Sequence, residues 1–371
     1  MTTVLVSGAG VAGTALAYWL GQHGYSVTVV ERHAGLRRGG QPVHVRGPAL
    51  TVLERAGLLD EARKCRTWVR GSSVVDADGN ELSKDIPAPT GSADIELPRE
   101  DLLELLYDAT RPQTEYLFDD TIVALRDDGA AVSVTFEREP ARDFDLVIGA
   151  DGMHSVVRSL AFGADEQYVE GLGTFAAVFT VPNFLDLDYW QTWNYGDSTM
   201  AGVYSVHENR EARAMLGFST GGSDPQPRID PRDVEGQLNE VQRRMAGEGW
   251  VRPQLLEYMR TAPDFYFDEM AQVKMGRWSH GRVALVGDAA YGSSPLTGQG
   301  TSAALLGAYV LAGELKLASP EYAGGFANYR EEFAEFARLN QWLIVDSIEG
   351  GAPIPQEVFD RIVCSIELKD Y

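Results

Sequence analysis

Three glycine-rich segments have residue types and spacings suited to holding phosphate and ribose groups. The first is Gly8-Ala9-Gly10-Val11-Ala12-Gly13, with the spacing of a dinucleotide-binding turn. Gly8 would permit the tight turn and Gly10 would let the backbone approach a pyrophosphate. Gly13 would let a helix pack closely on a strand. A bound phosphate would then lie at the positive end of a helix dipole.

The elements around this segment fit that chemistry. Residues 2–7 predict a short apolar strand, and the apolar spacing of residues 11–23 predicts a helix with Gly24 as its C-cap. Residues 26–30 predict a second strand that ends at Glu31, whose carboxylate can accept hydrogen bonds from ribose hydroxyls. The unit predicts a dinucleotide site and does not by itself distinguish NAD from FAD.

The second segment runs from Asp145 to Arg158. An apolar strand over residues 146–148 leads into a Gly-Ala-Asp151-Gly turn, and Ser155 and Arg158 then lie three positions apart on one helix face. A purely structural role is the alternative, in which Asp151 caps a turn or helix and Arg158 is a surface ion-pair partner.

The third segment repeats the strand and glycine-acid turn. Residues 281–286 lead into Gly287-Asp288, and a loop with Pro295, Gly298 and Gly300 then opens a long apolar helix predicted over residues 301–317. Asp288, like Asp151, has capping as its alternative role.

With these three segments in this order, the chain resembles the class A flavoprotein monooxygenases of the para-hydroxybenzoate hydroxylase type. Within them it looks most like the tetracycline-modifying and aromatic polyketide-tailoring FAD monooxygenases. Residues 38–46, 53–58 and 97–106 also look like this family, and the resemblance covers most of residues 1–350. It implies FAD as cofactor, NADPH or NADH as a transient reductant, and O2 as co-substrate.

The resemblance implies roles for the matched positions. Glu31 would hold the adenosine ribose, Arg99 the phosphate or ribityl region, and Asp288 the ribityl chain. Pro295 and the backbone of residues 298–302 would lie against the isoalloxazine. The expected cofactor-binding residues are Gly8, Gly10, Val11, Ala12, Gly13, Glu31, Arg32, Arg46, Arg99, Asp151, Asp288, Pro295, Gly298, Gly300, Thr301 and Ser302.

The chain departs from the family pattern at three places in the third segment and the helix that follows it. Tyr291 stands where His is usual, Ser294-Pro295 where Pro-Pro is frequent, and Ser302 where Asn is usual. Since serine is shorter, flavin contact at Ser302 is expected to run through water or the backbone. No catalytic side chain is assigned, because the flavin supplies the chemistry.

The expected fold is α/β, with a discontinuous Rossmann-like FAD-binding domain, an inserted β-sheet substrate domain and a long C-terminal helix. Short alternating runs predict strands at 175–181, 189–195, 200–206, 213–219 and 265–275, a hairpin at 69–85, and a linker at 224–231. Helices are expected at 233–245, 253–259 and 320–345. The expected domains are 1–70, 97–165 and 276–320 for FAD, 71–96 and 166–275 for substrate, and 320–371 for a bridging helix and tail.

Aromatic residues crowd the insert and suggest a flat apolar pocket over the flavin. Trp193, Tyr195 and Phe218 are candidates to contact substrate, with the protein core as their alternative location. Arg213 is a candidate anchor for an acidic or enolic substrate, and a solvated surface position is its alternative.

Composition excludes several classes of function. A net charge of −22 and a pI near 4.6 disfavour nucleic acid and anionic membranes as partners. The two cysteines and six unpatterned histidines predict neither a disulfide framework nor a metal site. The sequence contains no predicted signal peptide or membrane span, so a cytoplasmic location is expected.

The predicted function is an FAD-dependent monooxygenase. Reduced flavin would react with O2 to give a C4a-hydroperoxide, which transfers one oxygen atom to an aromatic or polyketide-like molecule by hydroxylation or Baeyer-Villiger reaction. A role in antibiotic biosynthesis or resistance is expected from the resemblance. Three alternatives remain: an FAD-dependent halogenase, a dehydrogenase, and an FAD-containing protein that only sequesters a ligand.

Overall fold

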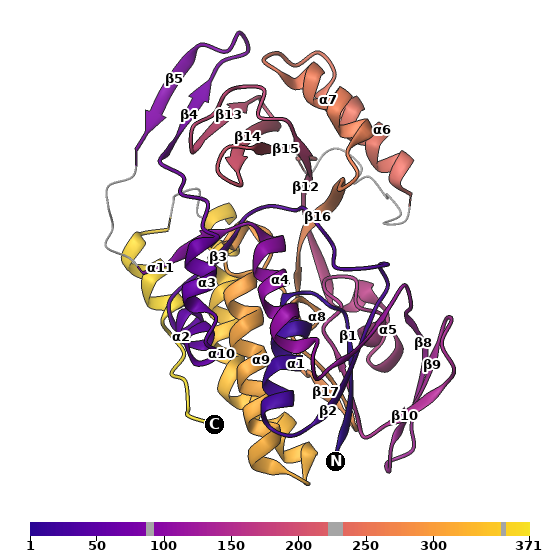
Figure 1. Cartoon of the computed structure of the whole chain (residues 1–371). Helices are drawn as coiled ribbons and strands as arrows, with labels where there is room; N and C mark the ends of the chain where they lie inside the picture. Colours follow the sequence, from indigo (N-terminus) through magenta and orange to yellow (C-terminus); the bar gives the residue numbers. More distant parts are fainter. Residues whose placement is uncertain (87–92, 222–232, 350–353) are drawn as a thin grey trace.

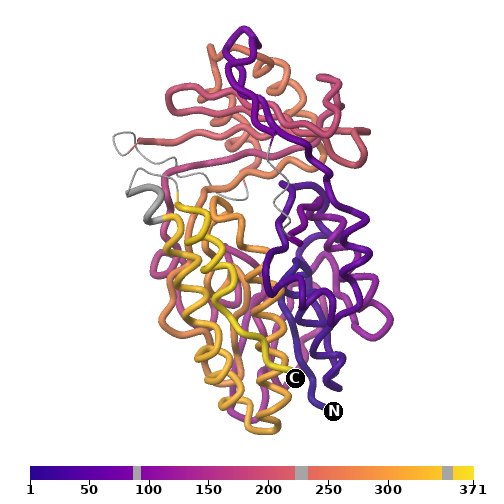
Figure 2. Tube along the Cα trace, turned by 90° about the vertical axis from the view of Figure 1, so that its left-hand side faces the viewer, coloured from indigo at the N-terminus to yellow at the C-terminus, as the bar shows by residue number. Residues whose placement is uncertain are grey.

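The computed structural model describes residues 1–86, 93–221, 233–349 and 354–371, so the predicted linker at 224–231 lies outside the described residues. Figure 1 shows two layers. A seven-stranded sheet with two helices forms one end of the molecule, and a mostly parallel sheet packed with helices forms the other. Both termini lie at the end far from the seven-stranded sheet, as the side view in Figure 2 also shows. The predicted α/β fold is confirmed.

The mostly parallel sheet has the strand order β17-β18-β11-β1-β2-β7, and only β17 is antiparallel to its neighbour. Its central strand β1 is apolar and almost entirely buried because helices cover the sheet. The carboxyl ends of β1, β2 and β11 therefore meet at one edge. The strands are β1 (Thr3–Ser7), β2 (Ser26–Glu31), β7 (Glu115–Phe118), β11 (Leu146–Gly149), β17 (Ser279–His280) and β18 (Val283–Leu285).

Two glycines allow α1 (Val11–Gln22) to start directly above β1. Gly8 has φ +100°, and a Cβ there would lie 2.6 Å from the carbonyl oxygen of Ala150. A Cβ at Gly13 would overlap the carbonyl oxygen of Gly8. A side chain at Gly13 would push α1 away from β1, as the spacing predicts, and one at Gly8 would collide with the turn after β11.

Helices pack in a bundle against this sheet. The long helix α9 (Gly300–Ala318) lies at the centre, between α1 and α10, and is buried on nearly every side. Beside β11 and β18, α5 and a small antiparallel sheet complete the layer. The other helices are α2 (Pro48–Arg55), α3 (Leu59–Lys64), α4 (Arg99–Thr110), α5 (Val156–Ala161), α8 (Asp288–Tyr291), α10 (Tyr322–Glu349) and α11 (Gln356–Val363).

Shorter elements connect these layers. The small antiparallel sheet is β8 (Ile122–Asp127), β9 (Val132–Phe136) and β10 (Arg142–Phe144). Two short 3-10 helices are η1 (Asp165–Gln167) and η2 (Pro295–Thr297). Strand β6 (Ile95–Leu97) crosses the expected domain boundary at residue 96 and pairs with β3 (Val43–Val45), not with the seven-stranded sheet.

The seven-stranded sheet has the order β16-β12-β15-β14-β13-β4-β5. Neighbouring strands in this sheet are antiparallel, except β13 and β4, which are parallel to each other. β4 and β5 form the predicted hairpin. The strands are β4 (Gly71–Val75), β5 (Glu81–Asp85), β12 (Val169–Val181), β13 (Trp190–Tyr195), β14 (Thr199–Val206), β15 (Glu211–Ser219) and β16 (Tyr266–Val273).

The two faces of this sheet have different partners. One face forms an apolar core with α6 (Val234–Met245) and α7 (Arg252–Thr261), in which Phe218 stacks on Phe175 with ring centroids 5.1 Å apart. Residues one position away in each strand point to the opposite face, toward the parallel sheet. This alternation decides which side chains can reach a site between the layers.

Helix α10 contacts both layers. It packs along α9, and near its C-terminal end the side chain of Gln341 donates a hydrogen bond to the carbonyl oxygen of Val273 in β16 at 2.6 Å. In the part of the chain that the structure describes, no helix has the length and apolar character to cross a bilayer. The described residues also contain no group of three His, Cys, Asp or Glu side chains placed to hold a metal, and both cysteines are free thiols.

Candidate functional site

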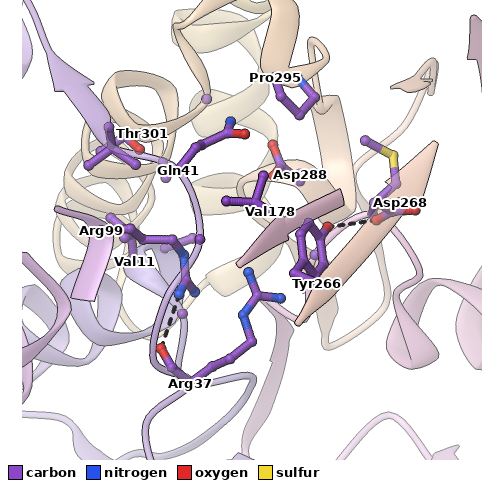
Figure 3. Close-up of a pocket in the computed structure, with 18 of the residues that line it drawn as sticks. Val11, Arg37, Gln41, Arg99, Val178, Tyr266, Asp268, Asp288, Pro295 and Thr301 are labelled. Atoms are coloured by element: carbon purple, nitrogen blue, oxygen red, sulfur yellow. Dashed lines mark hydrogen bonds between the residues drawn. The ribbon is translucent and has the colours of Figure 1, made fainter. Parts of the chain in front are cut away.

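A cavity of ≈ 810 Å³ lies between the carboxyl ends of the parallel strands and the seven-stranded sheet. The turns after β1, β2 and β11 form part of its wall, together with residues 37–46 and the segment leading into α9. One face of β12 to β16 closes it from the other side. Figure 3 shows residues from both layers pointing into this space. Ligand sites of open α/β sheets lie at such edges.

The β1–α1 turn presents backbone to the cavity. Gly10 is the N-cap residue of α1 and no side chain caps the helix. A Cβ on Gly10 would meet nothing within 4 Å, and Val11 and Ala12 also line the cavity. The first N–H groups of a helix have no acceptor within the helix, so this end can bind an anion. Gly13 does not line the cavity; its role is the close packing of α1 on β1.

Glu31 lies at the end of β2 and is fixed by backbone donors. Its Oε2 accepts from the Ala9 N–H at 2.8 Å, and its Oε1 accepts from the His33 N–H at 3.0 Å. Each carboxylate oxygen has a further lone pair for a ligand hydroxyl. Arg32 also lines this part of the cavity.

Asp151 combines the two roles that the sequence left open. Its Oδ1 accepts from the Ser155 hydroxyl at 2.5 Å and its Oδ2 from the Val156 N–H at 2.8 Å, so it caps α5 while lining the cavity. Burial raises the pKa of Asp151. The prediction that Ser155 lies on a helix face with Arg158 is wrong, because Ser155 is the N-cap of α5: its Oγ accepts from the Arg158 N–H at 3.0 Å.

Arg158 is fully buried, so a role as a surface ion-pair partner is wrong. Its guanidinium donates to the carbonyl oxygens of Met153 and Ala289, the second at 3.0 Å, and pairs with Asp165 at 2.7 Å. Two turns far apart in the sequence are thereby tied together by one side chain. The residue shapes the cavity wall without lining it.

Asp288 is the first residue of α8, and its side chain lines the cavity between the two layers. Burial raises the pKa of this carboxyl, and the Arg99 charge partly opposes the shift.

The segment before α9 forms another wall. Pro295, Gly298, Gly300 and Thr301 line the cavity. Gly298 has φ +62°, a left-handed conformation, and its carbonyl oxygen accepts from the Arg46 guanidinium at 3.4 Å. This bond fixes the loop beneath the cavity.

Two of the departures from the family pattern do not face the cavity. The Ser302 hydroxyl donates to the His44 carbonyl oxygen at 3.3 Å and accepts from the Arg46 N–H at 3.1 Å, which joins β3 to α9. Tyr291 is buried in the core, and Gly307 gives it room, since a Cβ there would overlap the Tyr291 hydroxyl. The Ser302 side chain does not line the cavity, so its hydroxyl joins parts of the protein, and the expected contact through water or the backbone stays a prediction.

Two arginines bring positive charge to the cavity. Arg99, the first residue of α4, donates to the Arg37 carbonyl oxygen at 3.2 Å (Figure 3). Burial, with the nearby Arg37 charge, lowers the pKa of Arg99 to about 10, so it remains charged at neutral pH. The Arg37 guanidinium lies 4.4 Å from the ring centroid of Tyr266. The residue next to Arg37, Arg38, is exposed and does not line the cavity.

Of the four expected substrate residues, only Trp193 lines the cavity. Phe218 points into the core with α6 and α7, and Tyr195 is 58% exposed beyond the cavity. Arg213 is buried, and ion pairs with Glu100 and Glu211 satisfy it, so its assignment as a substrate anchor is corrected.

The sheet face supplies cavity residues that sequence reasoning missed. Their shared feature is alternation: Gln191 and Trp193 are two apart in β13, and Tyr266, Asp268 and Met270 are two apart in β16. This alternation is visible in the sequence, but it does not show which face of each strand the helices cover. Tyr204 and Tyr266 are among the aromatic residues of the insert that the sequence suggested for a pocket. The cavity residues of the sheet that sequence reasoning missed are Ala176, Val178, Gln191, Met215, Asp268, Glu269 and Met270.

A histidine, also missed, joins the two layers beside the cavity. His154 Nε2 lies 3.2 Å from Asp268 Oδ1 of β16, and its Nδ1 lies 3.6 Å from Asp165 Oδ2. Its bonds to Asp165 and Asp268 raise the pKa of His154 to about 9, so it is protonated at neutral pH. Asp268 Oδ2 also accepts from the Tyr266 hydroxyl at 2.7 Å (Figure 3).

Most of the expected cofactor residues converge on this one cavity, from segments that run from Gly8 to Thr301. Those lining it are Gly8, Gly10, Val11, Ala12, Glu31, Arg32, Arg46, Arg99, Asp151, Asp288, Pro295, Gly298, Gly300 and Thr301.

Comparison with known proteins gives concordant matches. Residues 1–338 match the family model described as FAD binding domain. An uncharacterised protein of Mycobacterium tuberculosis (strain H37Rv) is 67% identical over 376 residues, covering 100% of both chains. A flavin-dependent monooxygenase of Legionella longbeachae is 35% identical over 341 residues, 91% of this chain and 86% of its own. The crystal structure of tetracycline destructase Tet(51) matches with TM-score 0.91 and 34% identity over 100% of both chains.

Proposed function

This chain belongs to the FAD binding domain family and is an FAD-dependent monooxygenase, and from this premise we propose how its cavity is used. FAD lies along the carboxyl ends of β1, β2 and β11, and an aromatic or polyketide-like small molecule lies against the seven-stranded sheet. The observation that carries the proposal is the convergence of three glycine-acid turns on one cavity roofed by a sheet.

The residues present fit FAD. The uncapped N-terminus of α1 and the open space at Gly10 suit a pyrophosphate, because backbone N–H groups and the helix dipole favour negative charge. Glu31 has its carboxylate fixed at the end of β2, where it can accept from ribose hydroxyls. The α1 turn would hold the phosphates, Glu31 with Arg32 the adenosine ribose, and Asp288 with Arg99 the ribityl chain.

The remaining walls would hold the flavin ring. Pro295 and the backbone of Gly298 to Thr301 are assigned to it, at the N-terminal end of α9. The domain assignment follows: residues 1–70, 97–165 and 276–320 bind FAD, residues 71–96 and 166–275 bind substrate, and residues 320–371 bridge the two.

FAD supplies the activation of O2 and the transfer of one oxygen atom. The chain's own residues orient the two molecules and exclude water from the space between the layers. We assign reduction to NADPH or NADH, supported by the positive charges of Arg37 and Arg46 beside the cavity.

The substrate class rests on the matched relatives and on the cavity. Tet(51) is a tetracycline destructase, so polyketide antibiotics are the first compounds to test as substrates. Hydroxylation and Baeyer-Villiger insertion both add one oxygen atom to such a molecule.

The test is turnover by the purified, flavin-loaded protein with NADPH or NADH in air. A monooxygenase consumes O2 with the reductant and gives a product heavier by one oxygen atom, detected by mass spectrometry. Reductant consumption without oxygenated product, across a panel of phenols and polyketides, would instead support a dehydrogenase. Halide incorporation would support a halogenase, and binding without consumption of reductant would support a ligand-sequestering protein.

A further inference from the structure

Gly202 occupies a special position on the cavity face of the seven-stranded sheet. It lies in β14 directly between Trp193 of β13 and Met215 of β15, both of which line the cavity. A Cβ on Gly202 would overlap Cζ3 and Cε3 of Trp193 and would lie 2.8 Å from Cη2. The six-membered ring of Trp193 therefore rests directly on the backbone of Gly202, which it buries.

The indole is held in this orientation by its neighbours. Its Nε1–H donates to Gln191 Oε1 at 3.2 Å, from the next cavity-facing position of the same strand. The Tyr204 ring lies beside it, with centroids 6.3 Å apart and planes 27° apart. Since one face of the indole covers Gly202 and the residue lines the cavity, the other face is available to a ligand.

Tyr204 adds a polar group beside this ring. The side chain is buried, and its hydroxyl has no hydrogen-bond partner among the described residues. Burial raises the pKa of Tyr204, so the hydroxyl keeps its proton and can act as a donor. An unpaired buried donor is costly, and a ligand oxygen that accepts from it removes that cost.

We propose that Trp193, lying flat on Gly202, is a stacking platform for a planar, fused-ring substrate, with the Tyr204 hydroxyl donating to an oxygen atom of that substrate. Gly202 is then a specificity-determining residue, because the absence of a side chain sets how deep the cavity is above the sheet. Aromatic rings gain from offset stacking, and two fused rings cover an indole more fully than one ring does. The inference rests on the proposed function and names the shape of the substrate.

The test measures ligand binding to the oxidised, flavin-loaded protein by isothermal titration calorimetry, with no reductant present. The probes are dihydroxyanthraquinone, which is planar and fused, and catechol, which has one ring. In Gly202→Ala, the new methyl group must push the indole into the cavity. We expect the Kd for dihydroxyanthraquinone to rise about tenfold, as for overpacked sites, and the Kd for catechol to change much less.

Gly217→Ala is the matched control. It adds the same methyl group to the cavity-facing side of the neighbouring strand, beneath the flexible side chain of Met200, which does not line the cavity. The Kd for both probes should stay at the wild-type value. An equal rise in the Kd for dihydroxyanthraquinone in both glycine variants would show a general effect on the sheet. It would overturn the proposal that Trp193 is a stacking platform.

A double-mutant cycle tests whether Gly202 acts through Trp193. Trp193→Leu alone should raise the Kd for dihydroxyanthraquinone about tenfold, since the stacking partner is gone. Adding Gly202→Ala to Trp193→Leu should have no further effect, because no ring remains to be displaced. Additive losses would mean that Gly202 does not act through the indole.

Tyr204→Phe removes only the unpaired hydroxyl. We expect the Kd for dihydroxyanthraquinone to rise about fivefold, the usual effect of losing one hydrogen bond. The thermal midpoint should not fall, because no bond within the protein is lost. A lower midpoint with unchanged Kd would show that the hydroxyl has a structural partner and would overturn its assignment to the ligand.

These readouts separate the inference from the proposed function. Bound flavin is checked by visible absorbance and turnover by product mass, independently of probe affinity. An active flavoprotein whose probe affinity is unchanged in Gly202→Ala contradicts the platform alone. A wild-type protein without flavin or oxygenated product contradicts the proposed function itself.

Discussion

The two walls of the cavity are built in different ways. At the β1–α1 turn, closely spaced glycines bring backbone N–H groups to the cavity, and a Cβ at Gly8 or Gly13 would collide with backbone. On the sheet opposite, the wall consists of side chains from five strands, and Gly202 makes room for a neighbouring side chain instead. The glycines of the first wall cannot be replaced without moving backbone, whereas side chains of the second wall can change by single substitutions.

This difference explains how one fold can keep its cofactor and vary its substrate. At the β1–α1 turn, a Cβ on Gly8 or Gly13 would collide with backbone, so this wall tolerates little change. Side chains on alternating strand positions can be exchanged without altering the sheet. Substitutions in the two walls should therefore differ in their effects on stability and on flavin binding.

Gly13→Ala should have the largest effect. Its Cβ would overlap the Gly8 carbonyl oxygen, so α1 must move off β1. We expect a loss of unfolding free energy of about 4 kcal/mol or more, measured by chemical denaturation, together with loss of flavin. Gly10→Ala is the control: a Cβ there meets no atom within 4 Å, so stability should persist while flavin affinity falls. Wild-type stability in Gly13→Ala would contradict the packing argument.

Arg158→Leu should be next. The change leaves the Asp165 carboxylate and two carbonyl oxygens without their buried partner. Breaking a buried pair in this way costs about 3 kcal/mol of unfolding free energy, measured by urea titration. Arg338→Leu removes an exposed arginine paired with Glu335 and should leave the urea midpoint unchanged. Similar midpoints for the two variants would mean that burial of Arg158 adds nothing.

A pH titration tests the contact between the walls through His154, which pairs with Asp165 below and Asp268 above. Its pKa is raised from 6.5 to about 9, so folding takes up a proton. The stabilisation is fully present below pH 6.5 and is lost as the pH rises through about 9.

Because the His154 side chain is 40% exposed, we expect its ion pairs to contribute only about 1 kcal/mol to the unfolding free energy. The loss should appear as a fall in the urea midpoint as the pH rises. His207 has a pKa raised to the same value by Asp101 and Glu211 and contributes over the same range. His154→Gln should therefore flatten part of the pH dependence, and His154→Gln with His207→Gln most of it. An undiminished slope in the double variant would exclude both histidines as its source.

Ser302→Ala should have the smallest effect. It removes the hydrogen bonds that join β3 to α9, at about 1 kcal/mol of unfolding free energy. Flavin affinity should not change, because the side chain does not line the cavity. Its neighbour Thr301 does, so Thr301→Ala should weaken flavin binding with little change in stability. Thermal denaturation and flavin titration of the two variants distinguish these outcomes, and flavin loss in Ser302→Ala would restore it to the site.

The contiguous motifs could be predicted from the sequence. The strand, Gly8 turn, α1 and Glu31 all follow one another within about thirty residues, and each has a local physical reason: turn geometry, helix dipole and strand end. The helices α9 and α10 were also predictable, because their apolar spacing is long and regular. For these elements the sequence was sufficient because the interactions that define them are short-range.

The wall formed by the seven-stranded sheet depends on contacts between segments far apart in the sequence. Alternation along β13 and β15 separates residues into two sets, but nothing local says which set α6 and α7 will cover. Both locations therefore stayed open for Phe218, which lies in the core. Arg213 was misassigned because its partner Glu100 is 113 residues away in another layer. Likewise, the indole of Trp193 rests on Gly202 only through strand pairing. Such contacts depend on which strands pair and which face is buried, and those are properties of the whole fold.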